Sequence, residues 1–85
     1  MMKLKMCWKE NESFEKIITY NINKVYVASD MTSKSSHLML EDIYGDLFVT
    51  NEPYPMRICK KIQKKIKSGL VTDLTQLPVH WVENN

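Results

Sequence analysis

Residues 55–68 concentrate positive charge more than any other part of the chain. This stretch holds one arginine, five lysines and no acidic residue, whereas the rest of the chain has six lysines against ten acidic residues, so the two parts carry formal charges of +6 and −4. An uncompensated cationic face is suited to phosphate groups or to an acidic patch on another protein. On a helical wheel, Ile58, Cys59, Ile62 and Ile66 form an apolar stripe. The opposite face holds Arg57, Lys60, Lys64 and Lys67, and Lys61 and Lys65 lie nearer the boundary with the stripe.

The sequence leaves three interpretations of this charge open: an acidic protein partner, nucleic acid, or a solvated face with no partner. Like charges four residues apart, such as Lys60 and Lys64, repel by about 0.2–0.5 kcal/mol per pair, and binding would explain why that cost is tolerated. A sequence pI of about 8.5 is low for a dedicated nucleic-acid binder, which favours the protein partner. Membrane adsorption is not expected, because the apolar stripe lacks the Trp or Phe that anchors interfacial helices.

The residue types that carry catalytic or metal chemistry are scattered. His37, His80, Cys7 and Cys59 are each isolated, without the spacing of a metal-binding or nucleophilic motif. Cys59 falls on the apolar stripe, where cysteine usually acts as a small buried hydrophobe. The acidic residues around Gly45 are typical of a solvated turn. We therefore expect no enzyme activity, no metal and no cofactor.

Four aromatic residues allow two uses. Tyr26, Tyr44, Phe48 and Tyr54 would form a base-stacking platform if they shared an open sheet face. A small core needs most of its aromatic residues, however, so burial is the favoured interpretation. Tyr44 is the exception, because a tyrosine at a hairpin tip is exposed and is a frequent interface anchor.

The length and composition indicate one small domain over residues 1–85. Two cysteines outside any CxxC pair, no signal peptide and no long apolar run predict a cytoplasmic protein with reduced thiols. The abundance of Lys, Ile and Asn is typical of an AT-rich genome, such as that of a phage. No family motif is present.

The first half of the chain is expected to form strands. Large apolar residues occupy every second position over residues 2–8, which predicts a half-buried strand. Residues 13–22 fit either a helix or a strand, and their β-forming residues favour the strand. The asparagines of 21–23 indicate a tight connection to a further strand over 24–28, whose two apolar faces favour a central place in the sheet.

The second half combines a hairpin, a helix and a tail. A loop is expected over 29–36, followed by a hairpin over 37–50 with Gly45 in its turn. Pro55 suits the first helical position and Gly69 the position after the last, which predicts a helix over about 55–68. In the tail that follows, Pro78 interrupts any regular element, and a short edge strand is expected over 79–82.

Together these elements predict an α+β fold. An antiparallel, curved sheet of four or five strands, over about residues 2–50, packs against one helix through Ile58, Ile62 and Ile66. The expected function is that of a small cytoplasmic, non-enzymatic adaptor or inhibitor that occupies a partner protein's surface, with a phage or mobile-element origin. The alternatives are a nucleic-acid-binding module that uses the same helix, and a homodimer formed through an exposed edge strand. The residues expected to make contact are Arg57, Lys60, Lys61, Lys64, Lys67 and Tyr44.

Overall fold

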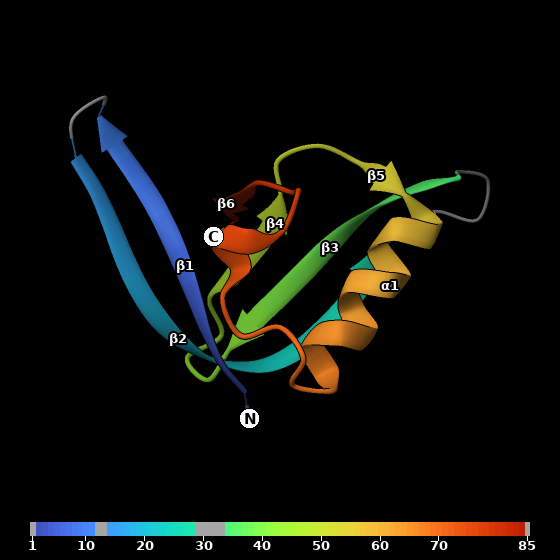
Figure 1. Cartoon of the computed structure of the whole chain (residues 1–85), viewed down its shortest axis with the longest axis horizontal. Coiled ribbons are helices and arrows are strands. Elements are labelled where there is room, and N and C mark those ends of the chain that lie inside the picture. The colour runs from blue at the N-terminus through green and yellow to red at the C-terminus, as the bar shows by residue number, and fades with distance from the viewer. Residues whose placement is uncertain (1, 12–13, 29–33, 85) are drawn as a thin grey trace.

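One curled antiparallel sheet and one helix make up the protein (Figure 1). The computed structural model describes residues 2–11, 14–28 and 34–84. The main sheet runs in the order β1-β2-β3-β4-β6, and the two-residue β5 pairs separately with β3. This architecture confirms the predicted α+β class. The elements are β1 (Met2–Asn11), β2 (Phe14–Ala28), β3 (Ser35–Asp42), β4 (Leu47–Thr50), β5 (Tyr54–Pro55), α1 (Met56–Lys67), the 3₁₀ turn η1 (Leu74–Gln76) and β6 (Trp81–Glu83).

Strand β2 gives the sheet its curl. It is 15 residues long, and its first half pairs with β1 whereas its second half pairs with β3. The prediction of a tight connection at 21–23 is wrong: the chain continues as one strand, and the register against β3 shifts between Ile22 and Lys24. A bulge of this kind bends a strand without ending it. The strand alternative for residues 13–22 is confirmed over the part that lies in β2.

The second half of β2 is not flanked by strands on both sides, so the predicted central position of residues 24–28 is also wrong. Among the described residues the β1 pairing ends at Ile22, and beyond it β2 pairs only with β3. The side-chain amide of Gln63 on α1 donates a hydrogen bond to the Val25 carbonyl, with a distance of 2.9 Å from Nε2 to the oxygen. A side chain of the helix therefore satisfies a backbone carbonyl at the edge of β2 that would otherwise pair with a neighbouring strand.

The hairpin between β3 and β4 confirms the clearest local prediction. Gly45 has φ +86°, a left-handed conformation that glycine adopts without strain. The buried carboxylate of Asp42 closes the turn, since its Oδ1 accepts hydrogen bonds from the backbone N–H groups of Tyr44 and Asp46, both at 2.9 Å. Of the loop predicted over 29–36, residues 29–33 lie outside the described part, and β3 already begins at Ser35.

Helix α1 begins one residue later than predicted and ends as expected. Pro55 is the N-cap residue and not the first helical residue, and no side chain caps that end. At the other end Gly69 has φ +79° and donates its N–H to the Ile66 carbonyl, which stops the helix. Across the part of the chain that the structure describes, no helix is long and apolar enough to cross a membrane.

The core lies between the concave face of the sheet and α1. Ile62 and Ile66 are buried as predicted, whereas Ile58 is partly buried at the core's margin. An aromatic group from three strands extends this core, because Trp8 and Tyr20 both pack on Phe48, with ring centroids 5.8 and 4.6 Å away. The buried apolar residues are Leu4, Met6, Ile22, Val25, Leu38, Leu40, Phe48, Cys59, Ile62, Ile66, Leu74 and Val79.

The tail after the helix closes the open side of the sheet. The Lys5 N–H donates to the Thr72 carbonyl at 2.9 Å, so the tail first runs beside β1. It then turns through η1 and reaches β4, where β6 pairs as an edge strand. The predicted edge strand is thus present, but over Trp81–Glu83 instead of 79–82, because Val79 is buried in the core ahead of it.

Candidate functional site

The basic face of α1, defined as Arg57, Lys60, Lys61, Lys64 and Lys67, is open to solvent. All five side chains are exposed, as is the neighbouring Lys65. Among the described residues the only ion pair joins the Lys24 ammonium to a Glu41 carboxylate oxygen, 3.7 Å away on the neighbouring strand. No carboxylate of the described residues therefore neutralises a cation of α1.

Packing fixes the direction in which this face points. Cys59, Ile62 and Ile66 are buried against the sheet, and the Gln63 hydrogen bond to β2 holds the helix from a second side. The cations are thus carried by a rigid element, and the row from Arg57 to Lys67 covers about 15 Å of helix at 1.5 Å per residue. A face of this length is preorganised to meet several anionic groups at once.

The helix dipole stabilises only part of this charge. Lys64, Lys65 and Lys67 lie in the last turn, where cations interact favourably with the carbonyl end of the helix. Arg57 and Lys60 lie in the first half, and Lys61 in the middle, so they gain no such stabilisation. Local helix energetics therefore do not account for the first half of the basic face.

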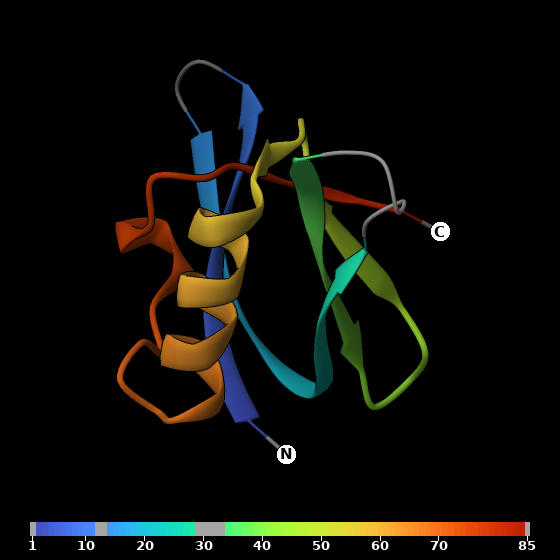
Figure 2. The ribbon, with the colours of Figure 1, turned by 90° about the vertical axis from the view of Figure 1, so that its right-hand side faces the viewer.

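Negative charge gathers at a distance from α1. Glu41, Asp42 and Asp46 belong to the end of β3 and the turn that follows it. In Figure 2 the helix stands on one side of the ribbon and this turn on the other. Glu41 is paired with Lys24, so among the described residues the unpaired carboxylates of this turn are those of Asp42 and Asp46.

Tyr44 is exposed as predicted, but the structure does not bring it to the basic face. Its side chain is 83% exposed and lies in the β3–β4 turn, beside the acidic residues. The five cations predicted as site residues thus form one surface, and Tyr44 belongs to another.

The aromatic residues do not form a base-stacking platform. Phe48 is buried, and the Tyr54 hydroxyl accepts a hydrogen bond from the His80 backbone N–H at 3.4 Å. Tyr26 is 36% exposed and lies on β2 opposite Met39, whereas Tyr44 lies beyond the end of β3 in the turn to β4. The core interpretation therefore holds for Phe48, and the shared open face is absent.

The two cysteines are free thiols in different surroundings. Cys59 is fully buried, its Sγ lies 3.2 Å from the Ser36 carbonyl oxygen, and burial raises the pKa of this thiol above its ordinary value. Cys7 is partly exposed on β1. Over the described residues, no three His, Cys, Asp or Glu side chains come together as metal ligands would.

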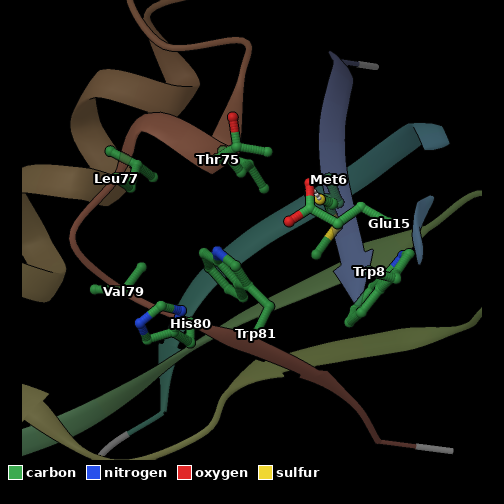
Figure 3. Close-up of a pocket in the computed structure, with 10 residues that line it drawn as sticks. Met6, Trp8, Glu15, Thr75, Leu77, Val79, His80 and Trp81 are labelled. Atoms are coloured by element: carbon green, nitrogen blue, oxygen red, sulfur yellow. Dashed lines mark hydrogen bonds between the residues drawn. The ribbon is translucent and has the colours of Figure 1, made fainter. Parts of the chain in front are cut away.

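A second feature has no counterpart in the sequence prediction. An open cleft of about 590 Å³ separates β1 from the chain between η1 and β6, and Trp8 and Trp81 both line it (Figure 3). The Trp81 indole N–H is buried and has no hydrogen-bond partner in the described structure. An unpaired buried donor costs about 1–3 kcal/mol. The two tryptophans are nearly the whole chain apart in sequence, so no local pattern could have joined them.

Comparison with known proteins adds no further constraint, since no protein-family model, curated protein or solved structure matches this chain.

Proposed function

We propose that this protein is a small non-enzymatic binding protein, an adaptor or an inhibitor, that occupies an acidic surface of a partner protein through the basic face of α1. The observation that carries the proposal is the exposure of every cation of α1 without a carboxylate partner among the described residues. Charge that is neither paired nor, in its first half, favoured by the helix dipole is best explained by an anionic partner.

The place of the acidic β3–β4 turn, on the other side of the ribbon from α1 (Figure 2), supports a protein partner. The acidic β3–β4 turn would be repelled by the surface that attracts α1, so the charge distribution orients the encounter as well as accelerating it. Tyr44, on the acidic side, would contribute only to a separate contact.

Nucleic acid is the second candidate, favoured by the row of cations along about 15 Å of helix. It predicts that the affinity falls steeply with salt, with a log–log slope of about −0.9 per phosphate contacted on duplex DNA. The formal charge of −4 outside the helix stretch opposes a close approach to a polyanion, so the protein partner ranks first.

The proposal includes a cytoplasmic location, in which two free thiols stay reduced. The Lys-, Ile- and Asn-rich composition favours an AT-rich genome, and a phage or mobile element that blocks a host enzyme or defence complex is one form of the inhibitor. Homodimerisation through an edge strand is a further alternative, and light scattering at high concentration that gives a mass of 10.0 kDa would exclude it.

The test is a pull-down with the tagged protein from a lysate of the cells that produce it, with nuclease present and at about 0.15 M salt. We expect a discrete protein band at near-stoichiometric amount with the wild type, and its loss with Lys60→Glu/Lys64→Glu. The matched control is Lys3→Glu/Lys16→Glu, which makes the same change in net charge at two exposed lysines of β1 and β2. Equal capture by both double variants would refute the role of α1, and nucleic acid recovered only without nuclease would favour the second candidate.

A further inference from the structure

The cleft between β1 and the tail is built from the two edges of one sheet. The strand order puts β1 at one end and β6 at the other, and the curl of the sheet brings these ends to face each other. Met6 and Trp8 line the cleft from β1, and Val79 and Trp81 from the tail (Figure 3). No residue of α1 lines it, so this site is separate from the basic face.

The edge of β1 is unpaired where the cleft begins. The Lys5 N–H points outward from the β1–β2 pair, because it donates to Thr72 on the tail. Alternate residues of an antiparallel strand turn their backbone groups to the same side, so the N–H and carbonyl of Cys7 also point outward. The tail leaves β1 after residue 73, and no backbone group of the described residues pairs with Cys7 on that side.

The opposite wall offers a second set of free groups. Asn51 donates to the His80 carbonyl, and Asn84 donates to the Leu47 carbonyl, so residues 80 and 84 turn their backbone toward β4. By the same alternation the backbone N–H and carbonyl of Trp81 point away from β4. The Trp81 indole N–H is also unpaired in the described structure. The outward-facing backbone groups of Cys7 and Trp81 are therefore the ones that an extended chain could use, since the indole N–H is buried.

One acidic side chain, that of Glu15, gives the cleft a negative charge at its rim. Glu15 on β2 is exposed at the rim, and among the described side chains its Oε2 receives only a long contact, from the Cys7 thiol at 3.9 Å. None of the described side chains forms an ion pair with it. The site thus combines an apolar interior, a free strand edge and a single carboxylate.

We propose that this cleft binds an extended segment of a partner protein, which pairs with β1 at Cys7 as an added strand, places an apolar side chain between Trp8 and Trp81, and presents a lysine or arginine to Glu15. Strand addition takes its affinity from main-chain hydrogen bonds and its specificity from pockets for alternate side chains. A small molecule would use the apolar walls but would leave the strand edge unpaired.

The probe is a panel of capped six-residue peptides that alternate valine and threonine, with one central lysine and a varied apolar residue beside it. Binding is followed by NMR of the intact protein. We expect at least one peptide to bind below about 1 mM, to slow exchange of the Cys7 amide at least about tenfold and to shift the Trp81 indole resonance.

Two N-methylated versions of that peptide test the pairing itself. N-methylation at one alternate set of backbone nitrogens removes the donors that face β1, and we expect at least about a tenfold loss of affinity, whereas N-methylation at the other set leaves binding intact. Glu15→Gln should weaken the lysine peptide several-fold and leave a glutamine-containing version unchanged. Lys60→Glu/Lys64→Glu should bind the peptides as the wild type does, so this result and that of the pull-down are independent.

Three outcomes would overturn the proposal. Equal binding of the two N-methylated peptides means that the cleft recognises side chains without strand pairing. No change at Cys7 with any peptide at about 1 mM means that the edge is closed to a strand. Protection of the Cys7 amide that rises with protein concentration alone means that the occupant is a second copy of this chain.

Discussion

Lys61→Glu should stabilise the fold while it weakens binding through α1. Lys61 is exposed and has a cation four residues away on each side, Arg57 and Lys65. Each of these pairs repels by about 0.2–0.5 kcal/mol, and a glutamate at this position would turn both repulsions into attractions of similar size. The free energy of unfolding should therefore rise by about 1–2 kcal/mol. Lys61 lies in the middle of the helix, so the dipole adds nothing of consequence.

Urea unfolding followed by circular dichroism measures this change, with the midpoint rising and the slope unchanged. In a thermal scan, 1 kcal/mol corresponds to a shift of about 4–8 °C for a domain of this size. The gain should shrink as salt is raised from about 0.05 to 0.5 M, since exposed charges are screened. The matched control is Lys3→Glu on β1, which should change the stability by less than about 0.5 kcal/mol.

A neutral or destabilising Lys61→Glu variant, or a gain equal to that of Lys3→Glu, would refute the reasoning. Either result would mean that the cations of α1 do not strain the helix, and that their presence needs no binding partner to explain it. A gain in stability with unchanged partner capture would separate the two claims, since it would place the interface elsewhere.

Three further outcomes follow from the structure. Asp42→Ala should lower the free energy of unfolding by about 2–4 kcal/mol, because two backbone N–H groups lose a charged acceptor. Asp42→Asn should retain much of that stability in the same urea measurement. Equal losses of stability in the two variants would show that the hydrogen bonds to Oδ1 are not responsible. Gly45→Ala should cost about 1–2 kcal/mol from backbone strain alone, since no atom outside residues 44–46 lies within 4 Å of the added methyl, and an unchanged urea midpoint would count against the left-handed turn. Burial raises the folded-state pKa of the Cys59 thiol, so the contribution of this thiol to stability is complete below the ordinary thiol pKa and is lost as the pH rises from that value through the raised one. In thiol labelling near pH 8, Cys7 should react on the order of 100-fold faster than Cys59. Equal labelling rates would contradict the burial of Cys59.

Elements with strong local signals were predictable from the sequence. The apolar stripe of α1 and the glycines at 45 and 69 were predicted because a helix face and a left-handed turn depend on nearby residues alone. The exposure of the basic face followed from the same periodicity. The break assigned to 21–23 was wrong because a turn and a bulge use similar residues, and only pairing with both β1 and β3 distinguishes them.

Long-range contacts were not predictable in this way. The tail has no clear periodicity because its backbone is held by Lys5, near the start of the chain, and by β4, in its middle. The separation of Tyr44 from α1 and the position of Trp8 and Trp81 on one cleft both result from the curl of the sheet. Residues that meet only through that curl leave no signal in a short window of sequence.

Amine footprinting of the protein bound to its captured partner tests the role of α1 most directly. Acetylation of each lysine is compared by mass spectrometry between the free and the bound protein, with Lys3 and Lys16 as exposed references on β1 and β2. We expect the lysines of α1 to be protected several-fold in the complex while both references label as before. Unchanged labelling of α1, with protection confined to other lysines, would contradict the proposal that its basic face is the binding surface.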